Sequence, residues 1–374
     1  MKQRTFNILL TVLFCLFIGG MFLGSLILPD RDFSQLENRK LAQTPALSLE
    51  NITTGKFMED AEDYVNDQIL GRDFWVALKA WSERVSGKQE NNGVYFAEED
   101  TLISRVDTPE QSTLDTNAGH VNALVDNVDV PVYFGIIPSA AEIWSDRLPE
   151  GAPTADEKAI IDRLYNEVQT HTIDLYSALA QHKDEDLYYR TDHHWTSLGA
   201  YYGYTALMDA MGLEAVPLDE GQKVTVSEDF YGTLFSSSGV RWLPPDHIDR
   251  YISDDGVTVT AYPNGTPEPG SLYVDSYLEV KDKYSSFLGG NKPLCVIETE
   301  HTDAPKVLVI RDSYADSLAP FLTQNFSEIH LFDPRYNLTS VKDYVTQNEI
   351  DSVVVLYSIS NFTARDNQMF VLGR

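Results

Sequence analysis

The chain has 374 residues, which is enough for one large domain or two modest ones. It carries 28 Lys and Arg residues against 57 Asp and Glu residues, a formal net charge of −29. Such an acidic surface is repelled by nucleic acid and by anionic lipid, so we expect neither as a partner. Solubility by itself accounts for most of this acidity.

The first segment predicts a membrane anchor. An uncharged apolar run from Phe6 to Leu28 is about long enough to cross a bilayer. Lys2 and Arg4 precede it, which predicts that the N-terminus lies inside and the rest of the chain outside. A cleaved signal peptide is the alternative, but the run is long for one and no clear Ala-x-Ala site follows it. We therefore expect residues 1–29 to anchor an extracellular domain in the cell membrane.

Only two cysteines are present, Cys15 in the apolar run and Cys295 in the exported part. No disulfide can therefore form within the exported part. A domain without disulfides must rely on a large hydrophobic core. The roughly 340 remaining residues are sufficient to build one.

Residues 30–95 predict a helical stalk or collar, because apolar residues recur there at near-helical spacing. Asn92-Gly93 is a turn signal near its end. We assign residues 96–374 to the main α/β domain. Within that domain, residues 216–294 are dense in Pro, Gly, Ser, Thr and Tyr. This composition favours a β-rich or irregular insertion that lies over the site.

Strand and helix patterns alternate through the main domain. Apolar runs predict buried strands at residues 130–137, 306–310, 329–332 and 352–357. Helical periodicity appears at residues 155–169, 197–211, 315–324 and 341–347. Strands that alternate with helices predict a parallel sheet with helices on both faces.

Ser313 follows one of these predicted strands. Functional loops gather at the carboxyl ends of strands in a parallel sheet. A helix is predicted to follow, and its amino end would favour negative charge that develops at the serine. The structural alternative is that Ser313 only caps this helix. The position therefore suggests a nucleophile without establishing one.

A second group of reactive side chains lies in the segment 188–196, which contains Asp192, His193 and His194. In an extended segment, residues i and i+2 point the same way, so Asp192 can orient His194 toward a nucleophile. His193 would then point to the opposite face. The structural alternative is that Asp192 caps a turn and that both histidines are satisfied structural groups.

A metal site is the competing interpretation of Asp192, His193 and His194, since Asp and His are good ligands. The other six histidines show no ligand-type spacing. The aspartate motifs of the metal-dependent phosphoesterases that carry an Asp-His-His are also not found. We therefore expect no metal and no cofactor.

Acyl-transfer chemistry also needs donors for an oxyanion. The backbone N–H of Ser313 is one candidate. Asn361 is another, because it follows a strand and can lie at the same edge of the sheet. Arg335 and Tyr314 are further residues that can line the cleft.

These segments resemble the DHHW-protein family of bacterial exported proteins. The resemblance covers most of the exported chain and is specific in combination. It rests on residues 189–195 with Thr196 and 199–202, and on residues 33–39, 229–234, 281–284, 289–291 and 311–315.

That family is similar to the alginate O-acetyltransferase branch of the SGNH-hydrolase superfamily. The resemblance implies a flavodoxin-like α/β/α sandwich in which an Asp-x-His element precedes the serine, a circular permutation of the usual order. By motif, it implies Asp192 as the acid, His194 as the base and Ser313 as the nucleophile. The usual Gly-Asp-Ser is replaced by Arg311-Asp312-Ser313. The resemblance also implies a membrane-bound O-acyltransferase as a partner.

Two functions follow from these observations. The first is a cell-surface O-acetyltransferase, or acetylesterase, that modifies an extracellular polysaccharide through an acyl-serine. The second is a non-catalytic envelope scaffold or glycan-binding protein that retains the fold. Arg311 in place of the usual glycine favours the second.

Overall fold

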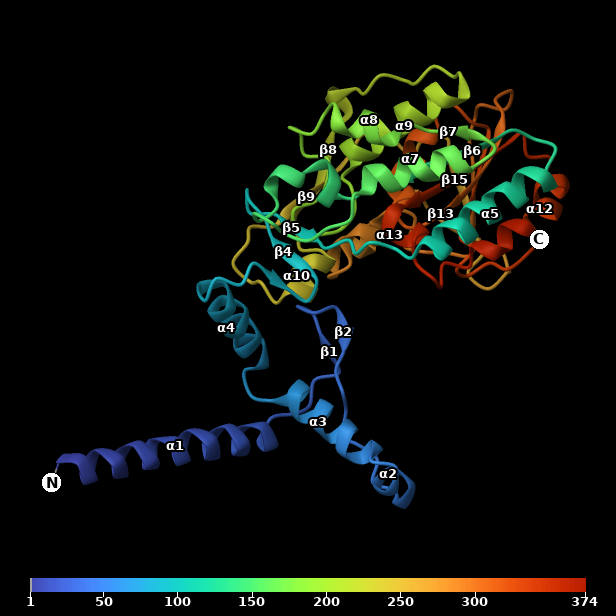
Figure 1. Cartoon of the computed structure of the whole chain (residues 1–374). Helices are drawn as coiled ribbons and strands as arrows, with labels where there is room; N and C mark the ends of the chain where they lie inside the picture. The colour runs from blue at the N-terminus through green and yellow to red at the C-terminus, as the bar shows by residue number, and fades with distance from the viewer. Residues whose placement is uncertain (1) are drawn as a thin grey trace. The chain divides into compact units, whose positions relative to one another are not determined.

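The computed structural model describes residues 2–374, and the chain divides into two compact units (Figure 1). Unit 1 holds the residues up to Lys88 together with Ser236–Trp242. Unit 2 holds Gln89–Phe235 and Leu243–Arg374. All of the predicted site residues belong to unit 2.

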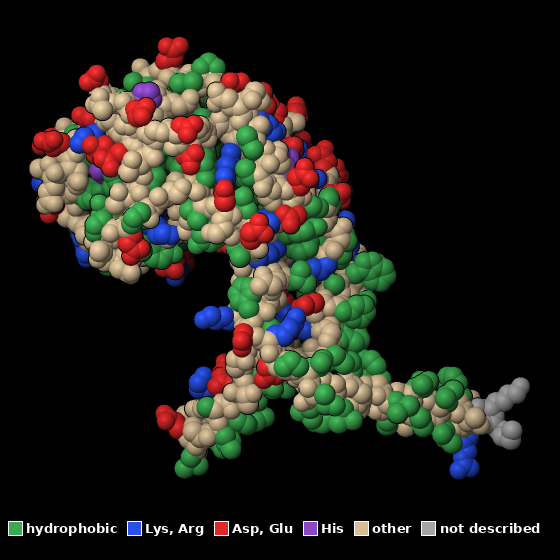
Figure 2. All heavy atoms as spheres, turned by 180° about the vertical axis from the view of Figure 1, so that it is seen from behind, with side chains coloured by type: hydrophobic (Ala, Val, Ile, Leu, Met, Phe, Trp, Pro, Cys, Tyr) green, Lys and Arg blue, Asp and Glu red, His purple; other side chains and the backbone are tan. Residues whose placement is uncertain are grey.

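Unit 1 is mainly helical. Its helices are α1 (Lys2–Ile27), α2 (Leu49–Thr53), α3 (Lys56–Gln68) and α4 (Arg72–Val85), and β1 (Phe33–Ser34) pairs with β2 (Arg39–Lys40). The stretch Gln3–Ile27 of α1 is apolar and long enough to cross a membrane, with a mean hydropathy of 2.4. It is a candidate anchor or signal segment, and apolar side chains cover much of its visible surface in Figure 2.

Ion pairs fix the segment that follows α1 within unit 1. Arg39 donates to both carboxylate oxygens of Asp67, at 2.8 and 2.5 Å. Arg72 makes a second bidentate contact with Glu37, at 2.6 and 2.9 Å. Bidentate pairs of this kind add geometric specificity as well as energy. They hold the segment that contains β1 and β2 against α3 and α4.

The centre of unit 2 is an eight-stranded sheet with the order β11-β10-β12-β14-β13-β15-β6-β7. Five neighbouring strands, from β14 to β7, are parallel, whereas β12, β10 and β11 add antiparallel pairs at one edge. The strands are β6 (Val132–Ile137), β7 (His171–Thr172), β10 (Thr258–Ala261), β11 (Glu268–Pro269), β12 (Leu294–Glu298), β13 (Lys306–Arg311), β14 (Glu328–Phe332) and β15 (Ser352–Ser358).

Helices cover both faces of this sheet because successive strand residues point to opposite sides. Val307 and Val309 pack into a core with α6 (Ala140–Ile143), α8 (Leu175–Ala180), α9 (Ser197–Met211) and α11 (Ala315–Leu322). Leu308 and Ile310 pack into the opposite core, with α5 (Gln111–Asn127), α7 (Glu157–Glu167), α12 (Val341–Gln347) and α13 (Ile359–Phe362).

Smaller elements complete unit 2. They are the β3–β4–β5 sheet (Glu90–Asn91, Val94–Phe96, Leu102–Ser104) and the β8–β9 ribbon (Val224–Phe230, Asp246–Arg250). Helix α10 (Thr233–Ser238) is divided between the two units, because Ser236–Trp242 belongs to unit 1. Five short 3₁₀ turns are η1 (Ser145–Arg147), η2 (Glu220–Gln222), η3 (Asp275–Glu279), η4 (Lys283–Ser286) and η5 (Met369–Gly373).

The predicted mixed α/β architecture with a large central sheet is confirmed, and local signals explain its element boundaries. α9 begins after Thr196, whose hydroxyl accepts from the Gly199 N–H at 3.2 Å, and ends at Gly212, whose φ of 67° suits glycine. Three features differ from the prediction. The sheet is not wholly parallel, and the segment 216–294 supplies β10 and β11 to it. The helix α5 has no counterpart among the predicted elements.

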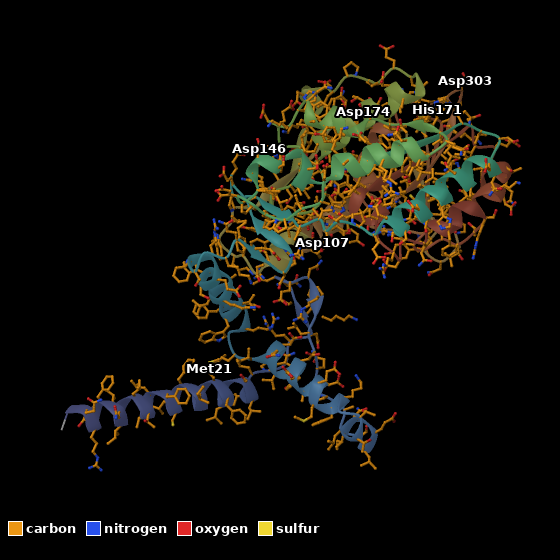
Figure 3. All side chains as sticks on the ribbon, in the orientation of Figure 1. Met21, Asp107, Asp146, His171, Asp174 and Asp303 are labelled. Atoms are coloured by element: carbon orange, nitrogen blue, oxygen red, sulfur yellow. The ribbon has the colours of Figure 1, made fainter. Side chains whose placement is uncertain are left out.

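The acidity of the chain lies at the surface of unit 2. Asp107, Asp146, Asp174 and Asp303, which are labelled in Figure 3, are all exposed. Figure 2 shows acidic side chains spread over the visible face of this unit. This distribution agrees with a role of the charge in solubility.

Candidate active site

The loop after β13 carries Ser313 at the carboxyl edge of the parallel strands. Asp312 fixes this loop, because its carboxylate accepts from the Tyr314 N–H at 3.0 Å and from the Ser358 N–H at 2.9 Å. The Ser358 hydroxyl adds a third bond at 2.6 Å. The loop is therefore tied both to the start of α11 and to the end of β15, and Ser313 itself stays partly exposed.

The Asp-His segment is a tight loop rather than an extended strand. An antiparallel bridge pairs Tyr188 with Trp195, and residues 190–194 form bends between them. The expectation that His193 points away from His194 is therefore wrong. The two imidazole centroids lie 3.9 Å apart, and His193 Nδ1 is 3.5 Å from Asp192 Oδ1. Bends replace the alternation on which that expectation depended.

The structure brings Asp192, His194 and Ser313 into one hydrogen-bonded line. His194 Nδ1 lies 2.6 Å from Asp192 Oδ1, and His194 Nε2 lies 2.8 Å from Ser313 Oγ. Asp192 and His194 are buried, at 3% and 6% exposure. This geometry allows His194 to take the hydroxyl proton of Ser313 while the carboxylate orients the ring.

Asp192 is held in its ionised form by its surroundings. Burial alone would raise the pKa of Asp192, but His193, His194 and the Thr233 N–H together lower it below the ordinary value. The Thr233 N–H donates to Oδ2 at 2.7 Å and the Thr233 hydroxyl at 3.0 Å. A Cβ on Gly232 would lie only 2.2 Å from the Cβ of Asp192, so this close approach requires glycine.

His194 is positioned from a second side by Tyr284, in η4. The two rings stack with centroids 3.8 Å apart and planes 8° apart. The Tyr284 hydroxyl donates to the Ser313 carbonyl at 3.0 Å and also contacts Ser317 Oγ at 3.1 Å. One buried tyrosine thus contacts both the imidazole and the backbone of the serine.

Arg311, the last residue of β13 and two positions before Ser313, is fully buried. Its Nη1 donates to the side-chain oxygen Oδ1 of Asn291 at 3.0 Å and lies 3.0 Å from Asp316 Oδ1, with Asp333 Oδ2 at 3.9 Å. Burial raises the pKa of the Asp316 carboxyl, and the positive charge of Arg311 opposes that rise. Two buried carboxylates and an amide therefore lie around Nη1 of the guanidinium, whereas Nε and Nη2 have no hydrogen-bond partner in the described structure.

The remaining predicted residues lie around this loop with partners of their own. Asn361 Nδ2 donates to Asp312 Oδ2 at 2.8 Å, which places the amide next to the serine loop. Arg335 makes a bidentate contact with Asp333, at 2.9 and 2.7 Å. The Tyr314 hydroxyl donates to the His193 carbonyl, so it links the two motifs.

The carboxylate and the two imidazoles also form a group of three possible metal ligands, whose ligand atoms lie within 4.8 Å of one another. In the present geometry these atoms bond to protein groups. His193 Nδ1 contacts Thr233 Oγ1 at 2.7 Å, and both nitrogens of His194 lie on the Asp192–Ser313 line. A cation bound through the aspartate and His194 would have to break that line. The donor set therefore suits proton transfer better than metal binding.

Sequence reasoning assigns no role to Tyr284, Thr233 or Gly232. All three lie in segments that support the family resemblance, residues 281–284 and 229–234. Their presence in those segments is the signal that could have pointed to them. Thr233 contacts Asp192, and Tyr284 contacts His194 and Ser313, although these residues lie far apart in the sequence. Local sequence patterns do not predict such long-range contacts.

Comparisons with known proteins identify the family and support the fold. A model of the DHHW protein family matches residues 110–332. A DHHW family protein from Eubacterium siraeum, solved as a crystal structure, is 26% identical with a TM-score of 0.66, and the match covers 75% of this chain and 95% of that one. A comparison with curated proteins gave no match.

Two further solved structures are similar. Bacillus cereus PatB1, solved with a sulfonyl adduct, is 21% identical with a TM-score of 0.62, over 74% of this chain and 98% of that one. The O-acetyltransferase domain of Pseudomonas putida AlgJ is 16% identical with a TM-score of 0.46, over 73% and 93%. The likeness to PatB1 supports the α/β fold of unit 2.

Proposed function

Because the chain belongs to the DHHW protein family, we propose that it is a serine-dependent O-acetyltransferase or acetylesterase acting on an extracellular polysaccharide. The observation that carries this proposal is the line Asp192–His194–Ser313, with contacts of 2.6 and 2.8 Å. A carboxylate, an imidazole and a hydroxyl in this order are the groups that acyl transfer through serine requires.

The first half-reaction is acylation of Ser313. Its Oγ attacks the carbonyl carbon of the acyl donor while His194 Nε2 takes the hydroxyl proton. The tetrahedral intermediate then collapses, the bond to the leaving group breaks, and the protonated imidazole returns its proton to that group. Asp192 stabilises the imidazolium between these steps.

The second half-reaction releases the acyl group. A sugar hydroxyl gives its proton to His194 and attacks the acyl-serine, and Ser313 recovers a proton as the ester bond to the serine breaks. Water in place of the sugar gives the esterase reaction. A cleft that excludes water favours transfer to the sugar, whereas a cleft that admits water favours hydrolysis.

We assign oxyanion stabilisation to the Ser313 N–H and to Asn361, with Arg335 and Tyr314 at the margin of the cleft. Asn361 is supported by its bond to Asp312, the residue before the serine. An amide nitrogen has two hydrogens, so one is left for a developing negative charge. The fold of this domain is, on this proposal, the flavodoxin-like sandwich of the SGNH hydrolases in circularly permuted motif order.

The cellular setting belongs to the same proposal. Helix α1 holds the protein in the cell membrane as a single-pass anchor, with a stalk over residues 30–95 and the catalytic domain outside. A membrane-bound O-acyltransferase supplies the acyl group from the inner side. The apolar stretch Gln3–Ile27 supports the anchor.

A non-catalytic, glycan-binding role is the second candidate, and Arg311 favours it. A buried guanidinium replaces the small residue that ordinarily forms this turn. If that replacement prevents the serine from reacting, the fold is retained without chemistry. This alternative predicts glycan binding with no acyl-serine from any donor.

The test is hydrolysis of an aryl acetate by the full-length protein in detergent, with and without an oligosaccharide acceptor. We expect acetate release that is lost in Ser313→Ala and His194→Ala. Acetylated oligosaccharide identifies a transferase, and free acetate alone identifies an esterase. If Ser313→Ala keeps full activity, the proposal fails for both reactions.

A further inference from the structure

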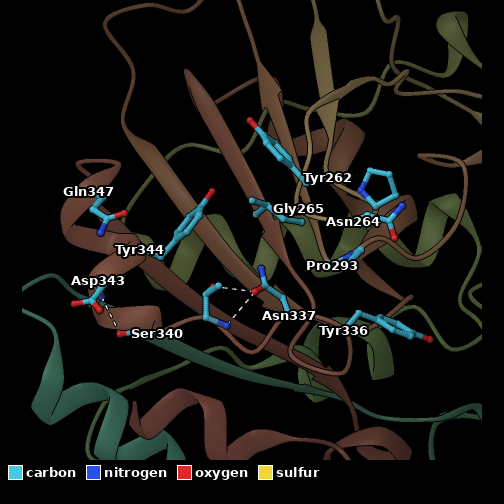
Figure 4. Close-up of a pocket in the computed structure, with 13 residues that line it drawn as sticks. Tyr262, Asn264, Gly265, Pro293, Tyr336, Asn337, Ser340, Asp343, Tyr344 and Gln347 are labelled. Atoms are coloured by element: carbon cyan, nitrogen blue, oxygen red, sulfur yellow. Dashed lines mark hydrogen bonds between the residues drawn. The ribbon is translucent and has the colours of Figure 1, made fainter.

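A pocket of about 760 Å³ lies in unit 2 among groups that the proposed reaction does not use (Figure 4). We call it the Tyr262 pocket. Three aromatic rings, three amides and a carboxylate characterise its lining: Tyr262, Tyr336, Tyr344, Asn264, Asn337, Gln347 and Asp343. They come from the loops after β10 and β14 and from α12, and Figure 4 shows these segments around the pocket.

The Tyr262 pocket opens at the same edge of the sheet as the candidate nucleophile. The strands β10, β14 and β13 run in one direction, as their pairings through β12 show. Phe332, at the end of β14, pairs with Ile310 of β13 on one side and with Leu294 on the other. The loops that follow these strands therefore emerge on one edge, where Ser313 also lies.

The lining has the chemistry of a sugar-binding site. Tyrosine rings offer flat apolar faces with a polar end, and amide side chains both donate and accept hydrogen bonds. Such a mixture of aromatic walls and a few fixed polar groups is typical of small-molecule sites. Tyr336 keeps 56% of its surface exposed, so its ring is accessible to a ligand.

Two of these groups are fixed in place. The Tyr344 hydroxyl contacts His330 Nδ1 at 2.7 Å, which orients its ring. The Asn337 carbonyl oxygen accepts from the N–H and the hydroxyl of Thr339, at 3.1 and 2.8 Å (Figure 4). A lining that is positioned before the ligand arrives loses less entropy on binding.

The charge of the pocket selects among glycans. Asp343 is an acidic lining residue, and none of the lining residues in the described chain is Lys or Arg. The Arg335 guanidinium lies 5.5 Å from the centroid of the Tyr336 ring, and its charge is balanced by its bidentate contact with Asp333. The chain as a whole also carries a net charge of −29. An anionic sugar would therefore be repelled, whereas an uncharged sugar would not.

We propose that the Tyr262 pocket binds an uncharged sugar unit of the acceptor polysaccharide and so presents a neighbouring hydroxyl to Ser313. This assignment rests on the proposed function, because it names the substrate class for that reaction. Binding itself can be measured without catalysis.

The binding test uses the full-length protein in detergent with Ser313→Ala as background. The probes are chitotetraose and maltotetraose, which are uncharged, and tetragalacturonate, which is anionic. We expect at least one neutral probe to bind by titration calorimetry and the anionic probe not to bind. Tyr336→Ala should weaken binding roughly tenfold, since an aromatic platform is lost. Tyr277→Ala, a tyrosine outside the pocket, should not.

The kinetic test separates this assignment from the proposed function. With Ser313 intact, Tyr336→Ala should raise KM for the oligosaccharide acceptor, whereas Tyr277→Ala should leave that KM and aryl acetate hydrolysis unchanged. If the original protein shows no hydrolysis or transfer activity, the proposed function is overturned. The binding experiment would still show whether the Tyr262 pocket binds an uncharged sugar. Failure of both neutral probes to bind, preferential binding of tetragalacturonate, or equal binding by Tyr336→Ala and Tyr277→Ala would overturn the pocket assignment.

Discussion

The ring of Tyr284 lies flat against the imidazole of His194, with centroids 3.8 Å apart and planes 8° apart. The same tyrosine donates its hydroxyl proton to the Ser313 carbonyl at 3.0 Å. One side chain therefore sets the orientation of the candidate base and the position of the candidate nucleophile together.

This relationship predicts different results for two substitutions of Tyr284. Tyr284→Phe keeps the stacked ring and loses only the hydroxyl contacts, so we expect a kcat within about tenfold of the original. Tyr284→Ala removes a buried ring, so it should lower kcat further and destabilise the fold by roughly 3 to 5 kcal/mol. Aryl acetate kinetics and urea unfolding measure the two effects. Equal kcat values for both variants would contradict a positioning role for the ring.

The buried ion pair of Arg311 predicts a loss of stability when the cation is removed. Arg311→Met leaves Asp316 and Asp333 without that cation in a buried site, which should cost roughly 3 to 5 kcal/mol of unfolding free energy. Asp333 keeps its bidentate contact with Arg335, so the double variant Arg311→Met/Asp316→Asn removes the carboxylate that is left without a cation and should recover part of the loss. Urea unfolding of both variants at pH 8 is the measurement. A double variant no more stable than Arg311→Met would show that the pairing does not matter.

Glu157 predicts a pH dependence of stability. Its side chain is fully buried and accepts from the Ser139 N–H and hydroxyl at 2.8 and 2.6 Å. Burial raises the pKa of Glu157 to about 7, against an ordinary value of 4.5. The folded protein therefore holds this proton more tightly than the unfolded chain does. Stability from this group is complete below about pH 4.5 and is lost as pH rises through 7.

The matched variant is Glu157→Gln, which keeps the shape and cannot ionise. Between pH 5 and pH 8 the original protein should lose about 2 to 3 kcal/mol more unfolding free energy than the variant does. Urea unfolding at the two pH values gives the comparison. Parallel pH profiles for the two proteins would show that the glutamate does not titrate in this range.

The sequence predicts most of the sheet because its strands and helices carry strong local patterns. Residues 341–347 were expected to form a helix and do so, and the apolar runs around Val309 and Val355 are central strands. Helix α5 was not predicted. Its buried positions are Leu114, Asn117, Ala118, Val121 and Leu124, so a polar and a small residue interrupt its apolar face.

The part of the candidate site that the sequence predicts consists of reactive residues that lie close together in the chain. Asp192 and His194 stand two residues apart, and the distance between them is a local property. The sequence argument pairs them through an extended segment, whereas in the structure a series of bends over residues 190–194 brings them together. Tyr284 lies about thirty residues before Ser313, and Thr233 about forty after Asp192. Such contacts depend on the path of the segment 216–294, which periodicity does not fix.

The most direct test of the central claim is mass spectrometry of the peptide that contains Ser313 after brief exposure to an aryl acetate. A sulfonyl fluoride serves as a second reagent. We expect an acetyl or sulfonyl group on Ser313 in the original protein and very little in Asp192→Asn, where the imidazole loses its orienting carboxylate. An unmodified Ser313 with both reagents, in folded protein, would contradict the account and leave the glycan-binding role.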